Sequence, residues 1–289
     1  MSESTFFIPK TADEWNELWM ARQSERINMN HDEAFWNERA KTFTQKDMPG
    51  SYTEQFLQLA DIRPHESVID MGCGTGNLSV PLGREGHEVL ACDFSSVMLE
   101  RLSQALDAQR IQSVRPLLLS WDDDWVKQGV EPDSCDIGLA SRSIITHDLL
   151  DALRKLTTTA RRRCCITMAT GCSPRVDDRM LREIGLPVYP SYDDVFALAM
   201  LQADGFLPTL DYIPNERYDR FDSFETALAK YTNMATAAAQ EVHVSEAELT
   251  KRVQEWLKHE LVEEEADGSI TLVTRRPRVQ HWAFIAWDK

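Results

Sequence analysis

One short stretch, Val68–Leu78, constrains this chain of 289 residues more than any other. An apolar strand there ends at an acid, Asp70, and three glycines follow at alternate positions: Gly72, Gly74 and Gly76. Glycine has no Cβ, so the backbone can turn sharply and a ligand can approach it closely. A helix is expected to begin near Asn77, and its free N–H groups would attract an anion such as a carboxylate. The stretch therefore predicts a ligand-binding loop between a strand and a helix.

A second acid follows at the end of the next predicted strand, Glu88–Asp93. In dinucleotide-binding folds an acid at this place holds ribose hydroxyls, and the same geometry serves any adenosine ligand. Phe94 and Met98 come directly afterwards and supply apolar groups suited to packing on an adenine ring. The pattern indicates a cofactor that contains adenosine.

The glycine spacing distinguishes two cofactor classes. Nicotinamide dinucleotides usually take G-x-G-x-x-G, whereas this chain has G-x-G-x-G with Asp70 two positions before it. An acid there would repel a pyrophosphate and would suit the ammonium of an amino acid. The sequence therefore favours S-adenosylmethionine, and a nicotinamide oxidoreductase is the alternative.

Val68–Leu78, together with Gly83–Leu102 (GREGHEVLACDFSSVMLERL), resembles the class I, Rossmann-like S-adenosylmethionine-dependent methyltransferases. The match covers the glycine loop, the ribose acid and the D-x-S-x-x-M-L start of a helix. The resemblance implies an α/β fold: a doubly wound, mainly parallel seven-stranded sheet with an antiparallel last strand. It also implies cofactor-binding residues. The methionine part of the cofactor would contact the loop residues Asp70, Gly72, Cys73, Gly74 and Gly76. The ribose would contact Asp93, and the adenine would lie between Phe94 and Met98.

The family often has a further acid after the third strand, where it meets the adenine amine. This chain has three in a row in Trp121-Asp122-Asp123-Asp124, and we assign the role to Asp122, with Trp121 packing nearby. The alternative for each of these acids is a solvated turn.

Short apolar strands alternate with helical patterns from Ser67 onward, which is typical of βαβ units. The predicted strands of this part are Ser67–Asp70, Glu88–Asp93, Val114–Ser120, Asp136–Ser141 and Cys164–Ala169. Helices are expected before this part, where Thr11 and Glu14 have capping-box spacing. Trp15, Leu18 and Trp19 then share one predicted helical face. We predict a single domain with an N-terminal helical lid (1–60), a cofactor-binding core (61–172), and a substrate cap with helical insertion and the last strands (173–289).

Charge bears on the acceptor. The chain carries 31 Lys and Arg against 47 Asp and Glu, a net charge of −16, whereas nucleic-acid binders rely on basic surface. The one dense basic run, Arg161–Arg163, is interpreted as the solvated start of a strand. These observations argue against a nucleic-acid partner and favour a small-molecule methyl acceptor.

Other sequence features bear on the cellular compartment of the protein and on whether it binds a metal ion. No apolar run approaches the ~20 residues of a membrane helix, and no secretory signal is visible, so we expect a cytoplasmic protein without a membrane partner. None of the six cysteines has C-x-x-C spacing, and no metal site is predicted.

Candidates for acting on the acceptor lie after the fourth predicted strand. By the resemblance, Ala140–Ile144 would face the reacting methyl group, and it lacks the Asn-Pro-Pro-Tyr signature of enzymes that methylate adenine or glutamine amino groups. Arg142 and His147 are the predicted catalytic residues, since a histidine titrates near neutral pH. The alternative is that Asp148 caps the helix starting at Leu149 and His147 is a surface residue.

Substrate contacts are predicted outside the core. Trp36 and Arg39 lie on the N-terminal lid, and Tyr189 lies in the aromatic region after the fifth strand. Methyl transfer is an in-line displacement that needs mainly alignment, so a missing catalytic dyad is no objection. The predicted function is methyl transfer to a small molecule; the alternative is a cofactor-binding regulatory protein that has lost transfer.

Overall fold

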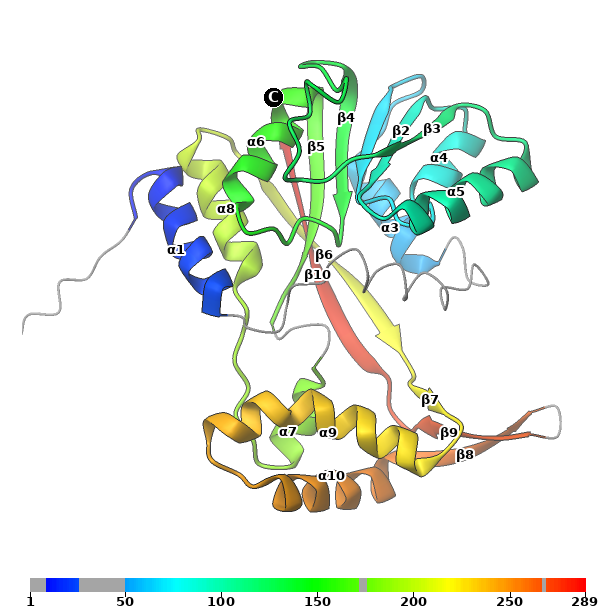
Figure 1. Cartoon of the computed structure of the whole chain (residues 1–289), viewed down its shortest axis with the longest axis vertical. Coiled ribbons are helices and arrows are strands. Elements are labelled where there is room, and N and C mark those ends of the chain that lie inside the picture. The colour runs from blue at the N-terminus through cyan, green and yellow to red at the C-terminus, as the bar shows by residue number, and fades with distance from the viewer. Residues whose placement is uncertain (1–8, 26–49, 172–175, 267–268) are drawn as a thin grey trace, which may run out of the picture. The chain divides into compact units, whose positions relative to one another are not determined.

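The computed structural model describes residues 9–25, 50–171, 176–266 and 269–289 (Figure 1). The chain divides into two compact units. The sheet unit comprises Met1–Met168, Asp193–Ile213 and Ala283–Lys289, and the helical unit comprises Ala169–Tyr192 and Pro214–Trp282. The predicted cap segment, 173–289, is therefore shared between the units, because 193–213 and 283–289 belong to the sheet unit.

Seven strands form the main sheet in the order β3-β2-β1-β4-β5-β10-β6. Neighbours among the first five strands of this order pair in parallel. The strands are β1 (Val68–Met71), β2 (Val89–Asp93), β3 (Val114–Leu118), β4 (Cys135–Ser141), β5 (Ala160–Ala169), β6 (Thr209–Arg217) and β10 (Arg278–Asp288). The predicted fold class, a mainly parallel seven-stranded sheet with an antiparallel strand and flanking helices, is confirmed.

The centre of the sheet explains the apolar runs of the sequence. All four residues of β1 are buried, as expected for a strand covered on both faces. The register places Asp70 opposite Ala91 of β2 and Leu139 of β4. Because these strands are parallel, their carboxyl ends meet at one edge of the sheet, and the residues that follow them lie close together.

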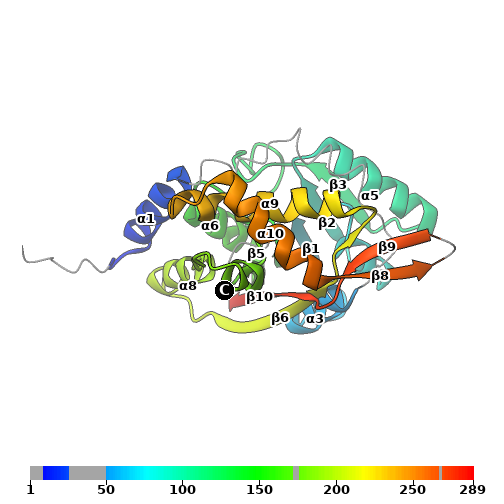
Figure 2. The ribbon, with the colours of Figure 1, turned by 90° about the horizontal axis from the view of Figure 1, so that it is seen from below.

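Helices cover the sheet on two sides, as Figures 1 and 2 show. Helices α4 (Ser79–Arg84) and α5 (Ser96–Gln109) contact β2 and β3, whereas α6 (Leu149–Thr159) contacts β4. Helix α8 (Asp193–Ala203) packs against α6. The helix predicted to begin near Asn77 is α4, which begins at Ser79 because the turns of the glycine loop extend through Leu78.

The first helix, α1 (Ala12–Glu25), packs on α6 and α8. Its capping is as predicted: Glu14 N–H donates to Thr11 Oγ1 at 3.2 Å, and the Glu14 carboxylate accepts from Lys10 N at 2.6 Å. The predicted apolar face was wrong at Leu18, which is 41% exposed, because α1 turns Trp15 and Trp19 toward Phe196 of α8. Helix α3 (Ser51–Ala60) contributes Phe56, which packs edge-on against Phe284 of β10.

The basic run Arg161–Arg163 lies at the start of β5, as predicted, with Arg161 exposed and the other two arginines half-buried. Each arginine has a carboxylate partner: Arg161 pairs with Asp136, Arg162 with Glu66 and Arg163 with Asp288. The run is thus neutralised along the strand and offers no unpaired basic stripe.

The helical unit contains α7 (Asp178–Glu183), α9 (Phe224–Glu241) and α10 (Glu246–Glu260), with a three-stranded sheet in the order β7-β9-β8. These strands are β7 (Arg220–Phe221), β8 (Leu261–Ala266) and β9 (Ser269–Thr274). Ser245 caps α10 by accepting from Glu248 N–H. Within the described ranges, no helix combines the length and the apolar character needed to cross a membrane.

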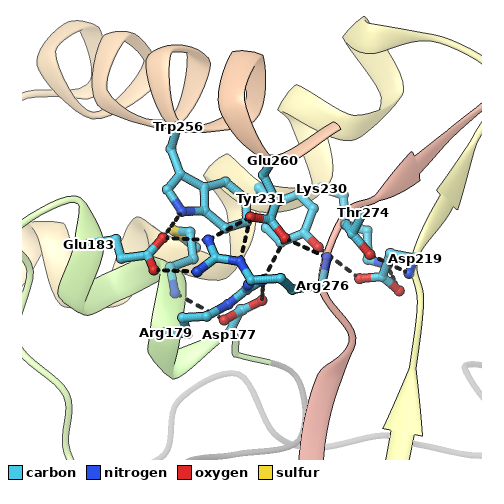
Figure 3. Close-up of polar contacts among 11 residues, drawn as sticks. Asp177, Arg179, Glu183, Asp219, Lys230, Tyr231, Trp256, Glu260, Thr274 and Arg276 are labelled. Atoms are coloured by element: carbon cyan, nitrogen blue, oxygen red, sulfur yellow. Dashed lines mark hydrogen bonds and ion pairs between the residues drawn. The ribbon is translucent and has the colours of Figure 1, made fainter. Parts of the chain in front are cut away.

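Buried charges tie the elements of the helical unit together (Figure 3). Glu260, 2% exposed, accepts from Arg179 at 2.9 Å and from Arg276 at 2.7 Å. Asp219 lies 2.8 Å from Lys230 Nζ and accepts from Tyr231 OH at 3.0 Å. Burial raises the pKa of Asp219, but the hydrogen bond and charge of Lys230 outweigh it and hold that pKa below its ordinary value. Paired in this way, the carboxylates link helices α7, α9 and α10 to one another or to the loops between neighbouring strands.

Candidate cofactor and acceptor site

The glycine loop follows β1, and all three of its glycines have positive φ, at 74°, 56° and 97° in chain order. A Cβ on Gly72 would lie 2.2 Å from Ser143 Cβ, and one on Gly76 would lie 2.6 Å from Leu102 Cδ1. These two positions therefore need glycine for close packing. A Cβ on Gly74 would meet no atom within 4 Å, so this part of the loop is open to a ligand.

The start of the loop is fixed by the neighbouring strand. The N–H groups of Gly72 and Cys73 both donate to Cys92 O, at 2.7 and 2.9 Å. Burial raises the pKa of the Cys73 thiol well above its ordinary range, with Asp70 and Asp93 adding to the effect. Cys73 is thus a buried neutral thiol, and its predicted contact with the cofactor stays a prediction.

Asp70 is 1% exposed and accepts a hydrogen bond from Ser79 Oγ at 2.6 Å. Burial raises the pKa of this carboxyl to about 6, and the nearby charge of Asp93 acts in the same direction. Within the described residues no lysine or arginine forms an ion pair with Asp70. The site therefore fits an incoming cationic group such as an ammonium, which would compensate the cost of the buried charge, and it disfavours a pyrophosphate.

Asp93 closes the loop from the other side. Its Oδ2 accepts from Gly74 N at 2.9 Å and its Oδ1 from Ser95 N at 2.9 Å. Burial raises the pKa of Asp93, while these backbone N–H groups lower it. Each carboxylate oxygen keeps a second lone pair, which can accept from a ribose hydroxyl. The sequence pattern predicts the ribose role and gives no sign that Asp93 also holds the glycine loop.

The predicted adenine residues lie at the start of α5. Phe94 is half-buried, whereas Met98 is buried. The N–H of Met98 donates to Ser95 Oγ, the side chain that caps α5. Phe94 is thus the more accessible of the two apolar groups, and the adenine contacts stay a prediction.

The acidic turn after β3 separates its three carboxylates by role. Asp123 accepts from Ser120 N at 2.7 Å, and Asp124 pairs with Lys127 at 2.8 Å. Asp122 is exposed, and no partner of its carboxylate is found in the described part of the chain. The carboxylate of Asp122 is therefore available to a ligand, and its contact with an adenine amine stays a prediction.

Trp121 joins this turn to the loop after β4. Its indole Nε1 donates to Ser143 O at 2.8 Å, and its ring lies 5.4 Å from that of Trp125. Ser143 Oγ in turn donates to Met71 O at 2.6 Å. The ends of β1, β3 and β4 are thereby connected beside the glycine loop.

A polar cluster occupies the carboxyl ends of β4 and β5. The hydroxyl of Tyr52 lies 2.8 Å from Ser141 Oγ and 2.7 Å from Thr167 Oγ1. The guanidinium of Arg142 stacks 4.2 Å above the Tyr52 ring, and Arg142 N donates to Thr167 Oγ1 at 3.0 Å. The structure thus places the predicted residue Arg142 beside the loop region that contacts Gly72.

Sequence reasoning missed Tyr52 and Thr167 as site residues. Tyr52 lies within residues 1–60, which the sequence predicts only as a helical lid, and Thr167 lies inside an apolar strand. One signal was present, because Thr167 interrupts the apolar run Cys164–Ala169 near its end. Polar residues at the carboxyl ends of parallel strands commonly face a ligand site.

His147 fits the alternative interpretation. Asp148 caps α6 by accepting from Asp151 N at 2.9 Å, and it also accepts from Asn16 Nδ2 at 2.9 Å. His147 is exposed. The role of His147 as a base stays a prediction.

The other predicted residues are dispersed. Tyr189 belongs to the helical unit and is 57% exposed. Trp36 and Arg39 lie outside the described residues. No group of three His, Cys, Asp or Glu side chains that could hold a metal ion occurs in the ranges described.

Comparisons with known proteins agree with this geometry. A family model described as a methyltransferase domain matches residues 68–164, the stretch from β1 into β5. A protein of Haemophilus influenzae without an assigned function is 28% identical over 260 residues, which cover 88% of each chain. A tRNA 5-carboxymethoxyuridine methyltransferase of Escherichia coli is 35% identical over 54 residues, 18% of this chain and 21% of that protein.

Solved structures share the fold. The YcgJ protein of Bacillus subtilis has a TM-score of 0.51 at 16% identity, over 82% of this chain and 97% of that one. A Bacillus halodurans protein provisionally named a methyltransferase has a TM-score of 0.52 at 13% identity, over 83% and 99% of the two chains. The family model covers the glycine loop and Asp93, and the shared fold extends over the rest of the sheet. Residues 68–164 therefore match a methyltransferase domain, and the chain shares the Rossmann-like fold of these solved structures.

Proposed function

We propose that this protein binds S-adenosylmethionine and transfers its methyl group to a small-molecule acceptor. The observation that carries the proposal is Asp70, a buried carboxylate without a cationic partner in the described structure, beside a glycine loop open at Gly74. S-adenosylmethionine offers an ammonium to the Asp70 carboxylate, and it has no phosphate that this carboxylate would repel.

Three acidic residues would each bind a different part of the cofactor. Asp70 would accept from the ammonium, Asp93 from the ribose hydroxyls, and Asp122 from the adenine amine. The bound cofactor supplies an activated methyl group on a sulfonium. Proteins of this kind contribute mainly alignment and exclusion of water, because methyl transfer is an in-line displacement.

A small acceptor is favoured by charge. The net charge of −16 opposes the approach of a polyanion, and the basic run Arg161–Arg163 is neutralised by Asp136, Glu66 and Asp288. The RNA methyltransferases among the relatives match only short segments of the chain, such as the 54 residues shared with the tRNA enzyme.

Isothermal titration with S-adenosylmethionine and S-adenosylhomocysteine tests the cofactor. We expect saturable binding of both by the wild-type protein and loss of at least about tenfold in affinity in Asp70→Asn, since a charge-assisted hydrogen bond is removed. Asp107→Asn, which removes an exposed acid of α5, is the matched control and should bind like wild type. Absence of binding by either compound at millimolar concentration would contradict the proposal.

A cofactor-binding regulatory protein without transferase activity is the second candidate. The exposed side chain of His147 and the use of Asp148 as a helix cap favour it, because no acid–base pair is formed there. Release of S-adenosylhomocysteine with any small acceptor would exclude this candidate. Tight binding of the cofactor without turnover across a broad panel of acceptors would support it.

A further inference from the structure

The polar cluster of Tyr52, Ser141, Arg142 and Thr167 lies at the boundary between the cofactor loop and the rest of the carboxyl edge. Ser143, next to Arg142, lies against Gly72 and donates to Met71 O. Ser141, on the other side of Arg142, contacts Tyr52 and pairs in register with Thr167 of β5. Arg142 therefore lies in a turn that links the cofactor loop to the ends of β4 and β5.

The backbone of Arg142 is held in an uncommon conformation. Its φ is 58°, in the left-handed region that residues other than glycine rarely adopt. The hydrogen bond from Arg142 N to Thr167 Oγ1 holds this conformation, and Thr167 is itself bound to the Tyr52 hydroxyl. Such a conformation costs free energy, and residues of this kind concentrate at ligand sites.

The side chain of Arg142 is oriented as well. Its guanidinium lies 4.2 Å from the centre of the Tyr52 ring, within the range of a cation–π interaction, and the side chain is exposed. The Tyr52 ring is itself fixed, because it is buried and its hydroxyl binds two strands. A guanidinium stacked on one face presents its N–H edge in a plane, which matches the geometry of carboxylate and phosphate oxygens.

We propose that Arg142 is the acceptor-binding cation of this methyltransferase, so that the acceptor is a small molecule with a carboxylate or phosphate group. Tyr52 is its positioning residue: the ring orients the guanidinium, and the hydroxyl fixes Ser141 and Thr167. The inference rests on the proposed function, because it places the acceptor beside the cofactor loop.

The test uses the full-length protein saturated with S-adenosylhomocysteine and titrated with three probes: succinate, inorganic phosphate and succinamide. Succinamide has the size of succinate without its charge. We expect saturable binding of succinate or phosphate and none of succinamide, with the stronger of the two anions identifying the acceptor group. In Arg142→Gln the anion should bind at least about tenfold more weakly.

Arg110→Gln is the matched control, because Arg110 is also exposed and also has positive φ, at 56°. It removes the same charge and should bind the anion like wild type. Tyr52→Phe keeps the ring and removes the hydroxyl, and Tyr52→Leu removes both. We expect Tyr52→Leu to weaken anion binding more than Tyr52→Phe, with affinity for S-adenosylhomocysteine retained in both.

The outcomes separate this inference from the proposed function. If wild-type protein does not bind S-adenosylhomocysteine, the proposed function fails. If it binds S-adenosylhomocysteine but binds neither anion, or binds succinamide as well as succinate, the inference on Arg142 is overturned. Equal anion affinity in Arg142→Gln and wild type would overturn it too.

Discussion

Asp70 shows how a single residue can be unfavourable for the empty protein and useful for the site. Its carboxyl is buried beside Asp93, with one hydrogen bond from Ser79 and no cation in the described surroundings. The raised pKa means that ionising this group costs the folded state free energy. A ligand ammonium would remove that cost, so part of the binding energy would come from relieving it.

Replacement of this carboxyl should therefore stabilise the empty protein. The pKa of Asp70 is about 6 when folded against an ordinary value of 3.8, so the folded protein binds more protons than the unfolded chain between these pH values. Stability should fall as the pH rises from about 4 to about 6 and remain reduced above it. We expect Asp70→Asn to raise the free energy of unfolding by about 1–3 kcal/mol at pH 7.5 and by much less at pH 4. Urea unfolding of wild type and Asp70→Asn at pH 7.5 and at pH 4 measures this difference in the free energy of unfolding. An equal gain in stability at the two pH values would contradict the prediction.

The affinity for S-adenosylhomocysteine should depend on the same ionisation of Asp70, but it should rise with pH where the stability of the empty protein falls. The carboxylate form of Asp70 accepts from an ammonium, so affinity should decrease as the pH falls below about 6. Titrations at pH 7.5, 6 and 5 would show this in the wild-type protein, and a flat profile over this range would count against it. In Asp70→Asn we expect weak binding with no such decrease.

Gly72 is required for a close contact. An alanine there would place Cβ 2.2 Å from Ser143 Cβ, so we expect Gly72→Ala to displace the Ser143 turn and weaken S-adenosylhomocysteine binding about tenfold or more. Adding Ser143→Gly removes the clashing atom and should restore part of the affinity. Gly86→Ala is the control, since φ is 88° there and a Cβ meets nothing within 4 Å. Calorimetric titration of wild type, Gly72→Ala, the double variant and Gly86→Ala with S-adenosylhomocysteine measures these affinities. If the double variant recovers no affinity, the loss in Gly72→Ala comes from backbone strain alone and not from the contact with Ser143.

At the scale of single residues, the sequence predicted best what depends on local spacing. The loop glycines and Asp93 lie within 22 residues of each other and share one motif. The contact of Tyr52 with Thr167 spans 115 residues, and no local pattern encodes it. It becomes visible only once α3 is packed across the ends of β4 and β5.

Among the elements, α1 illustrates how a helix outside the sheet reaches the site. Asn16 donates to Asp148 and accepts from Leu150 N, and Trp19 Nε1 donates to Thr146 O at 2.9 Å. These bonds join α1 to the turn that begins at Arg142 and to the first turn of α6. The helix thus stabilises the segment that carries the proposed acceptor-binding residue.

Loss of this anchor should be measurable. In Asn16→Ala the buried Leu150 N–H loses its acceptor, so we expect a loss of about 1–3 kcal/mol in the free energy of unfolding. Glu17→Ala, one position along on the exposed side of α1, should change stability little. Chemical denaturation of both variants makes the comparison, and similar values would show that α1 is not anchored through Asn16.

The elements that the sequence did not predict share physical causes. Strand β8 contains Glu263-Glu264-Glu265, all exposed, which hide the apolar alternation expected of a strand. Helix α7 has only six residues, too few to show a helical period. The error at Leu18 arose because two tryptophans, not a continuous apolar stripe, bury α1 against α8.

The division into two units is a property of the whole molecule. Residues 193–213 return to the sheet unit after the chain has entered the helical unit, so the units are interleaved in sequence. Contiguous boundaries such as 173–289 could not express this, because composition changes little between the segments that belong to one unit and those that belong to the other.

A variant of the helical unit should separate stability from cofactor binding. Glu260 is buried and contacts Arg179 and Arg276, so Glu260→Gln removes a carboxylate from both, although Arg276 keeps its ion pair with Glu183. Because both guanidinium groups are partly exposed, we expect a loss of about 1–3 kcal/mol in the free energy of unfolding. Hydrogen exchange should accelerate in α7 and α10, with affinity for S-adenosylhomocysteine unchanged at a temperature where the protein stays folded. Weaker cofactor binding by the folded variant would contradict the assignment of the cofactor to the sheet unit alone.

The position of β10 in the sheet has a consequence for synthesis of the protein. This strand lies between β5 and β6 in the sheet order but follows both in the chain. While the ribosome is still translating the segment up to β10, β5 has no neighbour on one side and β6 has nothing in the sheet to pair with. An unpaired strand edge is prone to association with other chains, and pairing across long sequence separations is slow. The nascent chain therefore depends on its last strand to complete the sheet, and protection of the β5 edge during translation is a natural point of action for a chaperone.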